Sequence, residues 1–314
     1  MTPKKTKLDW EIDQNCQERA GKQADELIES LGFGWPIDPL KVAATEHPIL
    51  AAGGRDLGDL YDGKLKFNKQ KKRFLLFFNT KYDRWEESGQ HHPRTRFSIA
   101  HELGHYFLED HRQHLRNGGN PHPSRGEFLN GERVEREADA FASSLLLPTH
   151  LAEPRLNSGE LNLQTIENVA ADFGASHLCT AIRGIRLTDE PCAVAGLREG
   201  RVAWMFPSKR LIEAKCYPPG KIDLDSPVAK RAWAAFEAGS DDKRSEDGLL
   251  RHWFKTFARE EDLAAVEVTE SFLPIRIMGT LVVLLTMSDS DLFSEEEEEE
   301  EDEIDTNHRA KFGW

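Results

Sequence analysis

Long apolar runs are missing from this chain of 314 residues, and cysteine is scarce. The apolar stretch 278–287 includes Gly279 and two threonines, and it falls short of the roughly 20 residues that cross a bilayer. It therefore predicts a buried strand. The basic N-terminus leads into the polar residues 8–11 and not into an apolar signal core. The four cysteines lie far apart without a C-x-x-C pair, which indicates free thiols. These absences favour a cytoplasmic protein that does not bind membranes.

Basic residues are also missing between Asp289 and Asp305, a stretch that holds 12 acidic residues. The formal net charge is −14, so setting these 12 charges aside leaves about −2 for the rest of the chain. A run of like charges repels itself and buries no apolar surface, which predicts a disordered acidic tail over residues 291–314. Because the remainder is nearly neutral, the net charge of −14 is no strong evidence against nucleic-acid binding.

The chain has about twice the length of a typical domain, which predicts more than one domain. Apolar spacing and Gly/Pro signals predict an α+β protein. The expected helices cover 13–31, 93–108, 132–147, 228–238 and 249–258, with two or three short ones in 161–187. The expected strands cover 73–79, buried on both faces, a hairpin over 57–67, and segments within 192–206 and 266–285. Residues 110–131 are expected to form a long loop, and long loops inside a domain are usually functional.

The most informative motif is His101-Glu102-Leu103-Gly104-His105, an H-E-x-x-H sequence within an apolar helical segment. Residues four apart share one face of a helix, so both imidazoles can reach one metal ion. Glu102 then lies beside them as the general base that activates water. This pattern predicts a catalytic zinc site, which requires a third protein ligand.

Two residues compete for the third position. His111 gives the spacing of metzincins, but Leu108 stands where that class has glycine, and no methionine occurs between Met1 and Met205 for its Met-turn. The stronger candidate is Glu135, on the helix after the predicted loop. Glu132, one turn earlier, is a weaker rival.

Side chains around these ligands have predicted roles as well. Asp139 shares a helix face with Glu135, so it can accept a hydrogen bond from the outer N–H of a ligand histidine. Glu137 points about 200 degrees away and is expected to pair with Arg133 or Arg136. Tyr106 is expected to point away from the metal face.

Residues 96–106, the segment 135–142 and Leu145-Leu146-Leu147-Pro148 together resemble the ImmA/IrrE family of zinc metallopeptidases, over about residues 15–150. The resemblance implies a zincin-like fold with one zinc ion, or another divalent metal, held by His101, His105 and Glu135, and with Glu102 catalytic. The loop over 110–131 is longer than the family minimum, and His111, His114 and His122 lie in it.

Longer members of that family imply the rest of the architecture. We expect a metallopeptidase domain over 1–150, a small helix-turn-helix-like segment over 151–189, and a C-terminal GAF-like α/β sensory domain over 190–290. The implied activity is cleavage of a helix-turn-helix repressor in a stress, mobile-element or phage-defence response. A small molecule or single-stranded DNA at the C-terminal domain is the expected activator.

An alternative hypothesis is a DNA-binding or sensory regulator with a degenerate metal site. It depends on residues 166–187, where only Arg183 and Arg186 offer strong phosphate contacts and Asp189 and Glu190 follow. So few positive charges predict weak, salt-sensitive binding. In the C-terminal half, the aromatic residues that could line a ligand pocket are more often core residues: Trp204, Phe206, Trp233, Phe236 and Trp253.

Overall fold

The computed structural model describes residues 7–83, 90–119, 133–218, 224–256 and 265–292. It divides into two compact units. Unit 1 comprises Met1–Arg155 and Glu167–Arg183, and unit 2 comprises Leu156–Ile166 and Gly184–Trp314. The predicted acidic tail falls almost wholly on residues 293–314, outside the described part of the chain.

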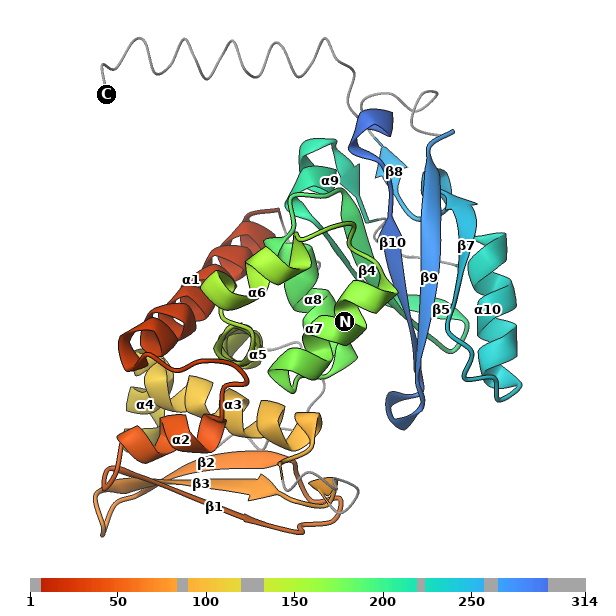
Figure 1. The fold of residues 1–314 in the computed structure, drawn as a ribbon. Helices are drawn as coiled ribbons and strands as arrows, with labels where there is room; N and C mark the ends of the chain where they lie inside the picture. The colour runs from red at the N-terminus through yellow and green to blue at the C-terminus, as the bar shows by residue number, and fades with distance from the viewer. Residues whose placement is uncertain (1–6, 84–89, 120–132, 219–223, 257–264, 293–314) are drawn as a thin grey trace, which may run out of the picture. The chain divides into compact units, whose positions relative to one another are not determined.

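Unit 1 is built on a three-stranded sheet of β1 (Leu50–Arg55), β2 (Gly63–Asn68) and β3 (Arg73–Asn79). The order is β1-β3-β2, with β1 parallel and β2 antiparallel to β3. Helices α2 (Pro39–Thr45) and α3 (Pro93–Phe107) lie over one face of this sheet (Figure 1). Helix α5 (Arg133–Leu146) packs between α3 and α1 (Lys7–Leu31).

The predicted hairpin over 57–67 is wrong. Residues 57–61 form no strand, because the buried side chain of Asn79 binds their backbone instead: it accepts from Leu57 N at 2.9 Å and donates to Gly58 O and Tyr61 O. Strand β3 instead pairs in parallel with β1, whose residues have low strand propensity. Gly54 is required there, since a Cβ atom would overlap the Phe78 ring.

Strand β3 is buried on one face only, contrary to the prediction. Phe74, Leu76 and Phe78 point into the core, whereas Leu75 is half-buried and Phe77 is exposed. The reason is that α2 and α3 cover a single face of the sheet, so the alternation along the strand separates core from surface.

The segment predicted as a long loop begins with a helix. Helix α4 (Glu109–Arg116) follows α3 directly and buries His111 and Leu115. The rest of that segment, including His122, lies outside the described residues. Helices α3 and α5 otherwise have the predicted positions.

Helices α6 (Thr149–Leu156), α7 (Leu163–Phe173) and α8 (His177–Leu187) follow, with Gly174 in the left-handed region between the last two. The turn is fixed to α3, because the buried guanidinium of Arg96 donates to Phe173 O and Gly174 O. Arg183 is also buried, donating to Leu147 O at 3.1 Å and lying 3.3 Å from Asp25. This arginine therefore serves the packing of unit 1.

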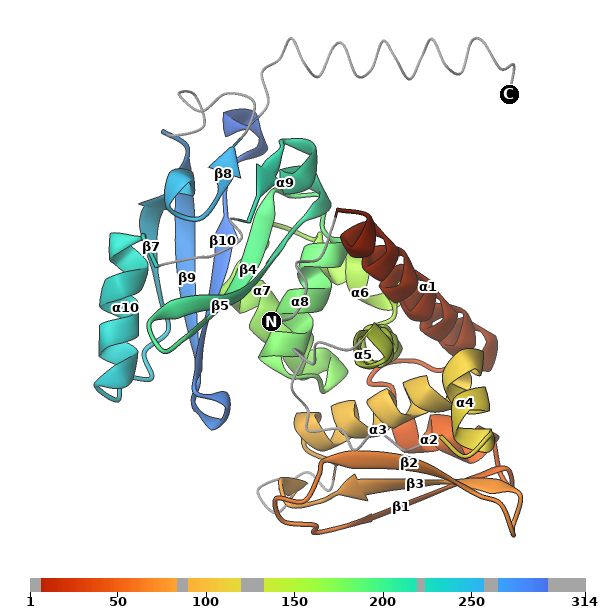
Figure 2. The same ribbon diagram turned by 180° about the vertical axis from the view of Figure 1, so that it is seen from behind.

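Unit 2 contains a five-stranded antiparallel sheet in the order β5-β4-β10-β9-β7, with β9 and β10 near its centre (Figure 2). The strands are β4 (Cys192–Arg198), β5 (Arg201–Pro207), β7 (Arg244–Leu249), β9 (Glu267–Ile275) and β10 (Thr280–Thr286). Helix α10 (Pro227–Glu237) packs against β7 and β9. Smaller elements are α9 (Lys209–Glu213) and the pair β6 (Cys216–Tyr217) and β8 (Lys255–Thr256).

The predicted helix over 249–258 is wrong, since a 3-10 turn (Leu250–His252) and strand β8 begin that segment and 257–264 lie outside the described residues. Trp253 and Phe236 are core residues of unit 2, as expected. All four cysteines are free and buried. Among the helices described, none has the length and apolar character needed to span a bilayer.

Candidate metal centre

Helix α3 presents the motif histidines from a buried position. Pro93 occupies its first turn, and the His92 side chain accepts a hydrogen bond from Arg94 N at 3.2 Å, which caps the helix. Twelve consecutive residues of the helix, 95–106, are buried. His101 and His105 stand one turn apart on the face toward α5, each 4% exposed.

Close packing of α3 on α5 brings the third residue of the cluster to these histidines. A Cβ atom at Gly104 would lie only 3.1 Å from Ala138 Cα and Ala138 O. The glycine of the motif thus allows the helix backbones to approach, and the small residue opposite does the same from α5. Glu135, one turn before Ala138, is carried to the histidine face and is 4% exposed.

The two Nε2 atoms and the carboxylate of these three residues converge. His101 Nε2 lies 3.1 Å from His105 Nε2 and 3.2 Å from Glu135 Oε2, and His105 Nε2 lies 3.6 Å from Glu135 Oε1. For a tetrahedral zinc ion with bonds of about 2.0–2.1 Å, neighbouring ligand atoms lie about 3.3–3.4 Å apart. The spacing and the N/N/O donor set therefore fit a zinc ion, and the cluster could hold one.

The outer nitrogen of His101 is held by Asp139, whose Oδ1 lies 2.8 Å from Nδ1. This contact places the proton on Nδ1 and leaves the Nε2 lone pair facing the cluster. Burial alone would lower the pKa of His101, but the hydrogen bonds to Asp139 and Glu135 outweigh it and raise that pKa to about 10. The carboxylates around His101 thus favour a positive charge at Nε2, which either a proton or a bound cation can supply.

The outer nitrogen of His105 is held by a second chain of contacts, which the sequence reasoning missed. His111 Nδ1 lies 3.1 Å from His105 Nδ1, and His111 Nε2 lies 2.9 Å from Glu137 Oε2. Arg133 Nε donates to the other oxygen of Glu137 at 2.7 Å. His111 therefore contacts the side of His105 that faces away from the cluster, not the position of a third ligand. Helix α4, absent from the prediction, places it there.

Electrostatics are consistent with this chain of contacts. Burial lowers the pKa of His111, which keeps the ring neutral, so it can accept from His105 and donate to Glu137. Burial would raise the pKa of Glu137, but hydrogen bonds from Arg133 and His111 lower it. The predicted pair of Glu137 with Arg133 is confirmed, and the same carboxylate also orients His111.

The remaining predicted residues have clear positions. Glu102 is completely buried, and its charge contributes to the raised pKa of its neighbour His101. Tyr106 points away from the cluster, donating to Glu46 Oε2 at 2.7 Å. His114 is exposed on α4. Glu132 lies outside the described residues.

Comparison with known proteins agrees with this geometry. The family model of the IrrE N-terminal-like domain, Peptidase M78, matches residues 61–183, which contain the whole His101, His105 and Glu135 cluster. Residues 61–183 form an IrrE N-terminal-like domain. The predicted family resemblance is thereby confirmed for residues 61–183, and the name of the matched family suggests a peptidase.

A solved structure shows that the similarity in fold extends beyond the IrrE N-terminal-like domain. A Mycobacterium tuberculosis transcriptional regulator superimposes with a TM-score of 0.54 over 88% of this chain and 78% of that chain. The two sequences are 12% identical, so the likeness concerns the fold alone. No curated protein sequence matches this chain.

Proposed function

We propose that this protein is a zinc-dependent endopeptidase with His101, His105 and Glu135 as its metal ligands. The observation that carries the proposal is the convergence of two imidazole nitrogens and one carboxylate, within 4.8 Å of one another, inside a Peptidase M78 domain. Three protein ligands of this type leave a fourth position open, which is the pattern of catalytic rather than structural zinc sites.

The chain's own residues supply orientation and proton transfer. Asp139 and His111 hold the outer nitrogens of the two histidines, so both Nε2 lone pairs point at one place. A zinc ion bound there supplies Lewis-acid activation of water and of the scissile carbonyl. Glu102, buried beside His101, accepts the proton of the attacking water and delivers it to the leaving amine.

For the substrate we propose a helix-turn-helix transcriptional repressor, as the family resemblance implies, cleaved in the cytoplasm in a signal-controlled response. Within the described residues, β2 is an edge strand of the unit 1 sheet and packs beside α3 and α4. An extended peptide can add to such an edge through main-chain hydrogen bonds. Unit 2 is proposed as the GAF-like sensory domain, with a small molecule or single-stranded DNA as its activator.

The alternative of a DNA-binding regulator has less support. Of the two arginines available for phosphate contacts in 166–187, Arg183 is buried and hydrogen-bonded to Leu147 O and Thr149 Oγ1. The donor atoms of the metal cluster also lie at distances suited to an ion, which speaks against a degenerate site.

The test uses the full-length chain loaded with zinc and the helix-turn-helix repressor encoded nearest to its gene. Mass spectrometry should find one cut in the repressor, and the Glu102→Gln variant, equally metal-loaded, should leave the repressor intact. Equal cleavage by both proteins would refute the catalytic assignment. If the protein binds zinc but cleaves no repressor, even under inducing conditions, the proposed metal ligands would remain supported. The proposal that the substrate is a repressor would then be refuted.

A further inference from the structure

Positive charge is concentrated in one short stretch of this acidic protein. Residues 64–73, which span most of β2, the turn and the first residue of β3, contain six lysines or arginines and no acidic residue. We call these six residues the basic hairpin: Lys64, Lys66, Lys69, Lys71, Lys72 and Arg73. The formal net charge of the whole chain is −14, so this local excess runs against the overall balance.

None of the six cations takes part in an ion pair with any residue that the structure describes. Neighbouring cations behave differently: Lys81 and Arg94 share Asp62, and Arg112 pairs with Glu109. Lys66, Lys69, Lys71 and Lys72 are exposed. Unpaired like charges held together repel one another, so the basic hairpin is a surface that an anionic partner would stabilise.

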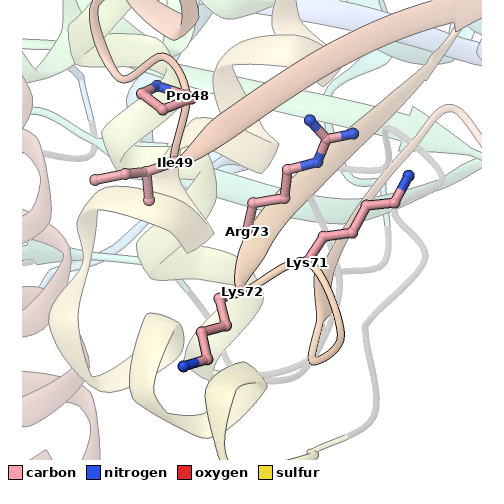
Figure 3. A pocket seen from close by; sticks show the side chains of 5 residues that line it. All are labelled: Pro48, Ile49, Lys71, Lys72 and Arg73. Carbon is pink, nitrogen blue, oxygen red and sulfur yellow. The ribbon is translucent and has the colours of Figure 1, made fainter.

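A cavity of about 360 Å³ opens at the turn of this hairpin, lined by Lys71, Lys72, Arg73, Pro48 and Ile49 (Figure 3). The Nε atom of Arg73 is buried and has no hydrogen-bond partner among the described residues. The cavity therefore offers space bordered by three cationic side chains.

The lining favours an extended ligand over a single small anion. Figure 3 shows the charged ends of Lys71 and Arg73 on one side, whereas the Lys72 side chain extends the opposite way. Pro48 and Ile49 form an apolar wall, with Ile49 49% exposed. A matching ligand combines carboxylates with apolar side chains. A nucleic acid fits less well, because its phosphate backbone has no apolar group to pack against Pro48 and Ile49.

Strand β2 extends this surface along the sheet edge. Lys64 and Lys66, two positions apart, project from the same face of β2, which is an edge strand in the described structure. Alternate acidic side chains of a strand added to this edge would lie opposite them, and opposite charges across paired strands attract. Helices α3 and α4, which carry His101, His105 and His111, pack against the same strand.

We propose that the basic hairpin and its cavity form a docking site for an acidic segment, interspersed with apolar residues, in the protein substrate. The proposal rests on the proposed peptidase function only in taking the partner to be a protein substrate. Docking there selects substrates by charge before cleavage, independently of the metal ligands.

The test measures binding, so that it does not depend on cleavage. Full-length Glu102→Gln protein is titrated with a fluorescent synthetic peptide of Glu and Leu, and with its counterpart of Gln and Leu. We expect salt-sensitive binding of the acidic peptide only. Lys71→Gln/Lys72→Asn should weaken it about five- to tenfold, since each exposed pair contributes up to about 1 kcal/mol. Asn tolerates the left-handed backbone of Lys72, whose φ is 48°.

The matched control is Lys22→Gln/Lys209→Gln, which removes two exposed lysines from helices elsewhere in the chain and changes the net charge equally. It should bind as the parent does. Arg73→Gln, which removes a cation from the lining of the cavity, should weaken binding as well. Three outcomes would each overturn the proposal. The two double lysine variants could weaken peptide binding equally, the acidic peptide could fail to bind, or a single-stranded oligonucleotide could bind more tightly than the peptide. Failure of the zinc-loaded parent protein to cleave the repressor, with binding of the acidic peptide intact, would instead count against the proposed function.

Discussion

Two buried glutamates, one in each unit, show why burial of an acid does not by itself make a functional site. Glu135 in unit 1 is 4% exposed and Glu270 in unit 2 is fully buried. Glu270 accepts hydrogen bonds from Ser226 Oγ, 2.7 and 2.8 Å from its two oxygens, and from Trp253 Nε1 at 3.0 Å. Glu135 instead faces the Nε2 atoms of His101 and His105.

The difference lies in what surrounds each carboxylate. Neutral donors of its own unit satisfy Glu270, and burial raises its pKa, so the group tends toward its protonated form. Around Glu135 the histidines have their outer nitrogens occupied, which turns lone pairs toward the carboxylate. A cation bound at this position would stabilise the grouping. We therefore expect substitutions around the metal cluster of unit 1 to change catalysis or metal binding. Substitution of Glu270 in unit 2 should instead change stability.

The largest expected effect is on catalysis. Glu102→Gln should keep fold and metal but lose repressor cleavage by about 10² to 10⁴-fold, because glutamine cannot accept the proton. Glu270→Gln, which also replaces a fully buried carboxylate, should cleave at the rate of the parent protein under the same inducing conditions. Comparable losses in both variants would mean that the effect is structural.

The next effect is on metal content. Glu135→Gln should lower zinc affinity by more than about 100-fold, since losing a ligand costs more than losing an outer contact. Elemental analysis after dialysis against a weak chelator should find the variant empty, while Glu270→Gln retains one ion per chain. Full retention by Glu135→Gln would remove it from the ligand set.

A smaller loss of zinc affinity is expected when a contact to an outer histidine nitrogen is removed. Asp139→Ala and His111→Ala should each weaken zinc binding about 10- to 100-fold, because each frees the outer nitrogen of one histidine. Glu137→Gln, one contact further out, should have a smaller effect. Competition with a chromophoric chelator measures all three. Affinity unchanged in His111→Ala would show that His105 is oriented without it, whereas complete metal loss would point to a direct ligand.

The smallest effect concerns the stability of unit 2. The raised pKa of Glu270 means that the folded state binds its proton more tightly than the unfolded state does. This stabilisation is fully present below the ordinary glutamate pKa of about 4.3 and is lost as pH rises through the folded-state value. Urea unfolding should show that decline in the parent and not in Glu270→Gln. Parallel pH curves would contradict the linkage.

The sequence by itself determined the local part of the site. His101, Glu102 and His105 share one helix, as do Glu135 and Asp139, so the helical repeat alone fixes which of these side chains lie on the same face. The strong apolar pattern around each group also fixed the positions of α3 and α5.

Tertiary structure decided what depends on contacts between distant segments. Strand β1 has little strand propensity of its own and forms because β3 supplies its hydrogen bonds. Residues 57–61 remain irregular because Asn79 satisfies their backbone. The contact of His111 with His105 requires the turn into α4 and the carboxylate of Glu137 on α5. No spacing in the sequence encodes such contacts, since they arise only when separate elements pack against one another.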